Sequence, residues 1–110
     1  MPRILCVDNG HAFHSVHHIL EQDGCEVVAS GSIQHALGVL AHQPIDGVVI
    51  SYTEGNTESL SLRNQIRHIE PYLPVLLLSE YGSAMRVSLH TLAAYIRENP
   101  VSEELVCSLD

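Results

Sequence analysis

The chain has 110 residues and is 45% hydrophobic, which suits a single domain spanning residues 1–110 with a packed core. Thirteen acidic residues stand against five arginines and no lysine, so the formal charge is -8 and binding to nucleic acid or anionic membranes is not expected. The first residues lack the apolar segment of a signal peptide, and no apolar stretch reaches the length of a membrane span.

In chain order, the first half alternates short apolar runs with amphipathic ones. Residues 3–7 read as a buried strand, and residues 11–22 as a helix that Gly24 should end. Residues 25–29 read as a second strand, and Ser32 is expected to cap a second helix. The inner face of that helix carries Ile33, Ala36, Leu37 and Leu40.

The second half continues the same alternation. Pro71 should end one helix, and Ser102 should cap the last one. The expected strands are 46–51, 75–79 and 94–97, and the expected helices are 57–70, 83–92 and 103–109. Because apolar strands alternate with helices, we predict an α/β fold of the (βα)5 type, with a doubly wound, five-stranded parallel sheet of flavodoxin-like topology.

The three cysteines, Cys6, Cys25 and Cys107, are an odd number and form no C-x-x-C pair. Two of them lie in apolar runs, where a thiol usually acts as a small buried hydrophobe. This usage suits a reducing compartment, so we expect a cytoplasmic protein.

Five segments follow one another in an order typical of a known family: ILCVDN at 4–9, EQDGCEVVAS at 21–30, PIDGVVIS at 44–51, IRHIEPYLPVLLLSE at 66–80 and AYIRENP at 94–100. Together they resemble the receiver domain of two-component response regulators over nearly the whole chain. The resemblance implies the receiver fold and a role in signalling through a phosphorelay.

The resemblance also implies a set of site positions, in which this sequence departs from the family. The acidic pair that helps to bind magnesium falls on Asp8 and Asn9, and the phosphoacceptor aspartate falls on Ser51. The hydroxyl position is kept as Ser79, whereas the lysine position falls on Glu98 or Asn99.

The missing groups are those that phosphoryl transfer requires. A carboxylate nucleophile needs a divalent metal and a cation to hold the transferred anion. Asp46 does not replace Ser51, because it lies five residues upstream, roughly 16 Å away along a strand. We therefore predict a pseudo-receiver that is not an enzyme, uses no metal or cofactor, and acts as a phosphorylation-independent protein-interaction module.

The resemblance further implies where such a module meets its partner. Receivers commonly use the face built from their fourth helix, fifth strand and fifth helix. In this sequence that face would include Arg86, His90, Tyr95 and Arg97. Its partner would be another protein or a second receiver, including a second copy in a homodimer.

Two alternatives stay open on the sequence. His11, His14 and His18 share one helix face and could bind a metal, which would suit a metal- or ligand-binding flavodoxin-type domain. His17, beside Leu20, is instead expected to be partly buried. The other alternative is a conventional response regulator that is phosphorylated on an atypical residue.

Overall fold

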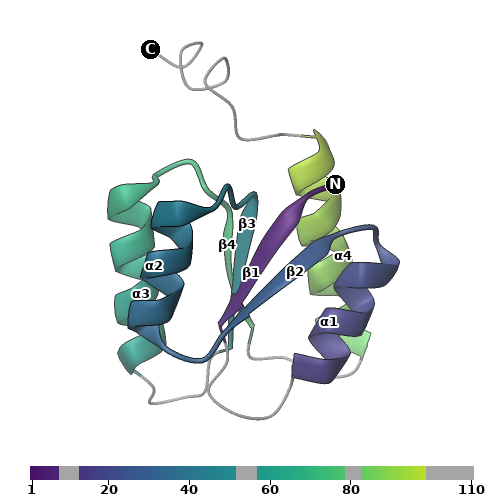
Figure 1. Cartoon of the computed structure of the whole chain (residues 1–110). Helices are drawn as coiled ribbons and strands as arrows, with labels where there is room; N and C mark the ends of the chain where they lie inside the picture. The colour runs from purple at the N-terminus through teal and green to yellow at the C-terminus, as the bar shows by residue number, and fades with distance from the viewer. Residues whose placement is uncertain (8–12, 52–56, 79–82, 99–110) are drawn as a thin grey trace.

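The computed structural model describes residues 1–7, 13–51, 57–78 and 83–98 and shows an α/β fold with a parallel sheet (Figure 1). The strands are β1 (Arg3–Val7), β2 (Glu26–Ser30), β3 (Gly47–Ser51) and β4 (Val75–Leu78). The helices are α1 (Phe13–Gln22), α2 (Ile33–His42), α3 (Thr57–Ile69) and α4 (Ser83–Glu98). Within these ranges the strand order is β2-β1-β3-β4, so the predicted parallel sheet is confirmed.

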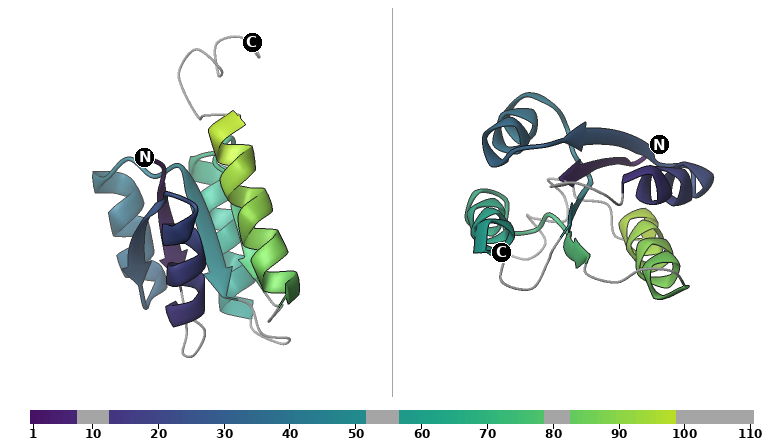
Figure 2. Two further views of the ribbon diagram at one scale, coloured as in Figure 1. Left: turned by 90° about the vertical axis from the view of Figure 1, so that its right-hand side faces the viewer. Right: turned by 90° about the horizontal axis from the view of Figure 1, so that it is seen from below.

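Helices cover both faces of the sheet, as a doubly wound fold requires. Helices α2 and α3 lie on one face, and α1 and α4 lie on the other (Figure 2). Each face has its own apolar core, with Leu5, Val48 and Leu62 on the α2–α3 side and Ile4, Val49 and Leu89 on the α1–α4 side. None of the helices in the described ranges has the length and apolarity to cross a membrane.

Two predicted helix boundaries are confirmed in detail. The Ser32 side chain accepts a hydrogen bond from the amide of His35 (3.1 Å), which caps α2. Helix α1 ends at Gln22, and Gly24 follows it with a φ of 80°, which suits a residue without a Cβ. There the amide of Cys25 donates to the carbonyl of Leu20 (3.0 Å) and the amide of Gly24 to that of Glu21 (3.0 Å), a Schellman pair of bonds.

The strand predicted over residues 94–97 is wrong, because these residues form the last turns of α4. The buried residues of α4 recur at helical spacing: Met85, Leu89, Leu92, Ala93 and Ile96. No proline or glycine interrupts this stretch, and its core-facing stripe runs unbroken through the predicted strand. The sheet of the described residues therefore has four strands rather than five. The helix predicted over 103–109 lies outside the described residues.

The last turns of α4 pack directly on the sheet. A Cβ atom built on Gly47 of β3 would lie 2.5 Å from the Cδ1 atom of Ile96, so a glycine lets the helix approach the strand closely. Helix α4 also contacts α1 along this face. Together these contacts hold residues 94–97 over the amino end of β3.

Asp46 has a structural role at the opposite end of β3 from Ser51. Its carboxylate accepts a hydrogen bond from the backbone amide of Arg3 (2.8 Å), and its own amide donates to the carbonyl of Arg3 (2.8 Å). These bonds align the first residues of β1 and β3. Asp46 thus lies at the entry to β3, which begins one residue later than predicted, at Gly47.

Candidate functional site

The candidate site lies at the carboxyl ends of β1 and β3. The chain runs outward from β1 to β2 on one side and, through β3, to β4 on the other, so the connections diverge between β1 and β3. Doubly wound folds open a crevice outside the carboxyl ends of the strands at this point. Val7 of β1 pairs with Ile50 of β3, which places Ser51 at the rim of that crevice.

A cavity of about 320 Å³ occupies this position. Apolar residues from β1, β3, α2 and α3 form its walls, and its polar groups come from Ser32, Ser51, Glu58 and Ser59. Three hydroxyl groups and one carboxylate therefore surround the space next to the predicted phosphoacceptor position.

Ser51 and Ser59 join the end of β3 to the first turn of α3. The Ser59 hydroxyl donates a hydrogen bond to the carbonyl oxygen of Ser51 (2.9 Å), and Ser59 is buried. A buried hydroxyl that is hydrogen-bonded to the backbone fixes the course of the chain at this point. Ser51 itself is half-buried, so its side chain lies at the boundary between the sheet and the cavity.

Glu58 is a site residue that the sequence analysis missed. It lies in the first turn of α3 and lines the cavity, where a carboxylate is also favoured by the positive end of the helix dipole. The signal that could have found it is its place directly after the loop that follows Ser51. Helices begin on that side of the sheet in this topology.

The described lining does not fit the magnesium ion that the family uses. Magnesium prefers several hard oxygen ligands in octahedral geometry, commonly with carboxylates among them. Glu58 is the one carboxylate among the cavity-lining residues that the structure describes, and the remaining polar groups are hydroxyls. No group of three or more His, Cys, Asp or Glu side chains suited to a metal occurs within those parts of the chain.

The other predicted phosphorylation-site positions divide into two groups. Asp8, Asn9, Ser79 and Asn99 lie outside the described residues. Glu98 ends α4, which runs antiparallel to the strands and finishes beside their amino ends (Figure 1). The structure therefore places Glu98 at the opposite end of the sheet from Ser51, because residues 94–97 form a helix where a parallel strand was expected.

The four predicted interaction residues all lie on α4, but they do not share one face. At 3.6 residues per turn, Arg86, His90 and Arg97 fall within about 40° of one another, whereas Tyr95 is about 180° from Arg86. The first three face the α1 side. Tyr95 lies on the side of the helix next to β4, with an exposed fraction of 52%.

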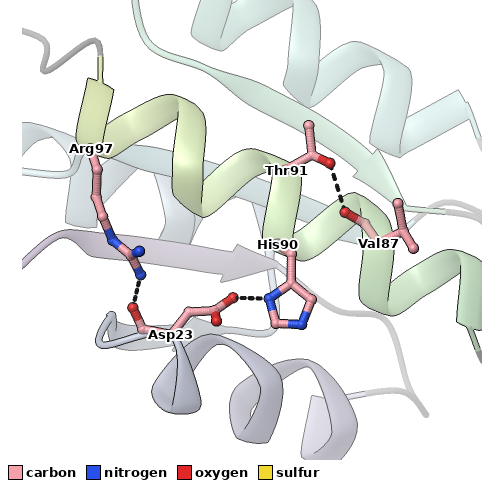
Figure 3. A network of polar contacts seen from close by, with 5 residues as sticks. All are labelled: Asp23, Val87, His90, Thr91 and Arg97. Atoms are coloured by element: carbon pink, nitrogen blue, oxygen red, sulfur yellow. Dashed lines mark hydrogen bonds and ion pairs between the residues drawn. The ribbon is translucent and has the colours of Figure 1, made fainter.

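Two of these residues contact Asp23, just beyond the end of α1 (Figure 3). The Nδ1 atom of His90 lies 2.5 Å from a carboxylate oxygen of Asp23, and the Arg97 guanidinium donates to the carbonyl oxygen of Asp23. His90 and Arg97 therefore join α4 to α1 within the chain. Arg86 is exposed on the same side of α4.

The histidine stripe can be placed only in part. His11 is outside the described residues, and of His14 only the backbone within α1 is described. His18 is exposed on α1, and His17 is half-buried, as predicted.

Comparisons with known proteins agree with the fold. No protein-family model matches the chain, and no curated protein matches it. Among solved structures, a response regulator from Thermotoga maritima is 32% identical, with a TM-score of 0.64 and coverage of 84% of this chain and 77% of that one. The receiver domain of NtrC4 from Aquifex aeolicus is 18% identical, with a TM-score of 0.70 and coverage of 89% and 98%.

A third similar structure is a complex of a histidine kinase with the response regulator TrrA of Thermotoga maritima. It is 24% identical, with a TM-score of 0.61 and coverage of 81% of this chain and 80% of that one. The strand order, the crevice beside Ser51 and the 32% identity over most of both chains lead to one assignment. The chain belongs to the family of response regulator receiver domains of two-component signalling.

Proposed function

We propose that this chain is a single receiver domain that acts through protein contacts, without aspartyl phosphorylation and without catalysing a reaction of its own. The observation that carries the proposal is the serine at the end of β3. Ser51 ends β3 and lines the cavity, and the resemblance to receivers implies that the family's phosphoacceptor aspartate falls on this position. A serine hydroxyl is a weak nucleophile unless a neighbouring base or metal activates it.

The surroundings of Ser51 support the same proposal. Glu58 brings negative charge to the cavity, which repels a phosphodonor unless a metal neutralises it. The whole sequence contains no lysine that could hold a transferred phosphoryl group. A receiver that is not phosphorylated never gains the doubly charged phosphoryl group. The contacts of that group would otherwise make an active state differ in energy from an inactive one.

A phosphorylation assay tests the proposal. We expect incubation with acetyl phosphate and magnesium to leave the intact mass of the protein unchanged. The variant Ser51→Asp should also stay unlabelled, because it restores a nucleophile but adds a negative charge near Glu58 and supplies no cation. A stable gain of one phosphoryl group that is lost in Ser51→Ala would overturn the proposal.

The proposed partner is a protein. One similar response regulator was solved in complex with a histidine kinase, which supports a protein partner for this chain. In this chain, Arg97 and His90 are engaged with Asp23, so Tyr95 and its neighbours on the β4 side of α4 are the better candidates for a binding surface. The buried cysteines Cys6 and Cys25 suit a reducing cytoplasm, where we place this function.

A further inference from the structure

Strand β4 is an edge of the sheet formed by the described residues. It pairs with β3 on one side, and the strand order within those residues ends there. The amide of Val48 donates to the carbonyl of Pro74 (2.9 Å), so in a parallel ladder the amide of Leu76 faces β3. The amides of Val75 and Leu77 then point away from β3, toward the outer edge.

An apolar groove of about 460 Å³ runs beside this edge, between β4 and α4. Val87 and Tyr95 of α4 border it, with exposed fractions of 63% and 52%. None of its lining residues is charged; they are Pro74, Val75, Leu76, Val87, Ser88, Thr91, Leu92 and Tyr95. The groove thus presents no charged side chain, although the chain has a net charge of -8.

The two edges of the sheet differ in protection. Natural proteins usually block an edge strand with charged side chains, proline or a bulge. Strand β2 begins with Glu26, whose carboxylate forms an ion pair with Arg3 (3.1 Å), and Glu26 is exposed. Strand β4 has the sequence VLLL, with no charged residue, and three of its residues are half-buried.

We propose that β4 pairs with β4 of a second copy of this chain, in antiparallel orientation, to make one continuous sheet across a twofold dimer. A twofold axis perpendicular to the sheet keeps the α4 helices of both copies on the same face. Val87 and Tyr95 of each copy then lie across the axis from those of the other. The inference deepens the proposed function, because it names the partner and the surface of the interaction module.

A second copy fits this surface for reasons of charge and symmetry. Two chains that each carry -8 repel over most of their surfaces, but the described residues that line this groove carry no carboxylate. When β4 pairs with β4 of a second copy, the backbone groups on the outer edge of each strand also form hydrogen bonds with those of the other. Pairing β4 with β2 would extend indefinitely, whereas β4 with β4 closes at two copies.

The first test is the mass of the full chain in solution. We expect sedimentation equilibrium to show a change from 12.1 kDa to twice that mass over concentrations from about 1 µM to about 1 mM. Val87→Glu should weaken dimerisation at least about tenfold, and Val87→Arg should do the same, since each places two like charges across the axis. Ile69→Glu on α3 is the matched control, because Ile69 is 60% exposed and α3 lies on the opposite face of the sheet from α4 (Figure 2).

The second test locates the contact. Hydrogen exchange at the amides of Val75 and Leu77 should slow as the protein concentration rises. The dimer is refuted if the protein stays monomeric, or if Ile69→Glu disrupts it while both Val87 variants do not. Protection that is independent of concentration also refutes it, because the edge would then be covered within a single chain.

These results are separate from the phosphorylation assay. A protein that dimerises through β4 and is also phosphorylated would overturn the proposed function and leave the dimer intact. A protein that is neither phosphorylated nor dimeric would refute the dimer and leave the proposed function intact.

Discussion

At the scale of single residues, Asp23 connects two helices through two different groups. Its carboxylate contacts His90, and its carbonyl oxygen accepts a hydrogen bond from Arg97 (Figure 3). Asp23 follows the last turn of α1, where the helix dipole leaves partial negative charge on the carbonyl groups. The Arg97 guanidinium therefore stabilises the carboxyl-terminal end of α1 and lies in the last turn of its own helix, which also favours a cation.

Removing this contact should have a modest cost. We expect Arg97→Ala to lower the free energy of unfolding by about 0.5–1.5 kcal/mol, because the side chain is exposed and solvent screens its charge. Arg86→Ala removes an exposed arginine from the same side of the same helix and should change it by less than about 0.5 kcal/mol. Urea unfolding of both variants makes the comparison, and equal losses would show that the Asp23 contact contributes nothing specific.

A second prediction concerns Cys25, whose thiol is ionisable and whose side chain is buried. Burial raises the pKa of Cys25 above its ordinary value of 9.0, and the nearby Arg97 guanidinium offsets part of the rise. A raised pKa in the folded state means that the neutral thiol stabilises the fold below pH 9.0. That contribution is lost as the pH rises from 9.0 through the folded-state pKa.

The cost of replacing Cys25 should therefore depend on pH. We expect Cys25→Ala to be most destabilising near neutral pH and to differ progressively less from the wild type above about pH 9. Val27→Ala, at a half-buried position of β2, is a control whose cost should not change with pH. Denaturation curves between about pH 7 and about pH 11 provide the measurement, and parallel pH profiles for the two variants would contradict the assignment.

At the scale of elements, the position of α4 depends on one close approach to the sheet. Ile96 lies over Gly47 of β3, with no room for an additional methyl group between them. The neighbouring atom is the flexible end of the isoleucine side chain, so the helix can adjust at some cost. If residues 94–97 formed a strand beside β4, Ile96 would be separated from β3 by β4 itself.

A double-mutant cycle distinguishes these arrangements. We expect Gly47→Ala to destabilise the protein by about 1–3 kcal/mol through overpacking. Ile96→Val alone should cost about 0.5–1.5 kcal/mol, and the combined variant should cost less than the sum because valine lacks the Cδ1 atom that clashes. Strictly additive costs would mean that Ile96 and Gly47 are not in contact.

At the scale of the whole molecule, the sheet carries two cores that depend on different helices. Leu62 of α3 is 1% exposed in one core, and Leu89 of α4 is 0% exposed in the other. The two cores share the strands, since successive residues of β1 point into opposite cores. We therefore expect the two cores to unfold in a single cooperative transition.

Truncating either leucine tests this cooperativity. Leu62→Ala and Leu89→Ala should each cost about 2–5 kcal/mol, a large part of the total stability of a small domain. For both variants, the unfolding curves from far-ultraviolet circular dichroism and tyrosine fluorescence should coincide. An early, separate transition in Leu89→Ala alone would show that α4 detaches before the rest of the fold.

The sequence by itself determined the elements up to the end of β4 and the boundaries of several helices. Apolar runs between helices predicted the parallel strands, and Ser32 and Gly24 marked helix ends through hydrogen bonds with their own neighbours. The crevice followed from the same alternation, because helices and strands in this order bring the ends of β1 and β3 together. These features arise from local chemistry, which a single sequence expresses directly.

Only the tertiary structure determined that residues 94–97 are helical, and which side chains share a surface with them. A short run such as AYIR suits either a strand or a buried helical turn, since periodicity does not separate the two over so few residues. The contacts of Ile96 with Gly47, and of His90 and Arg97 with Asp23, join segments far apart in the chain and favour the helix. They also separate Tyr95 from Arg86, because a helix turns by about 100° at each residue and a strand alternates between two faces.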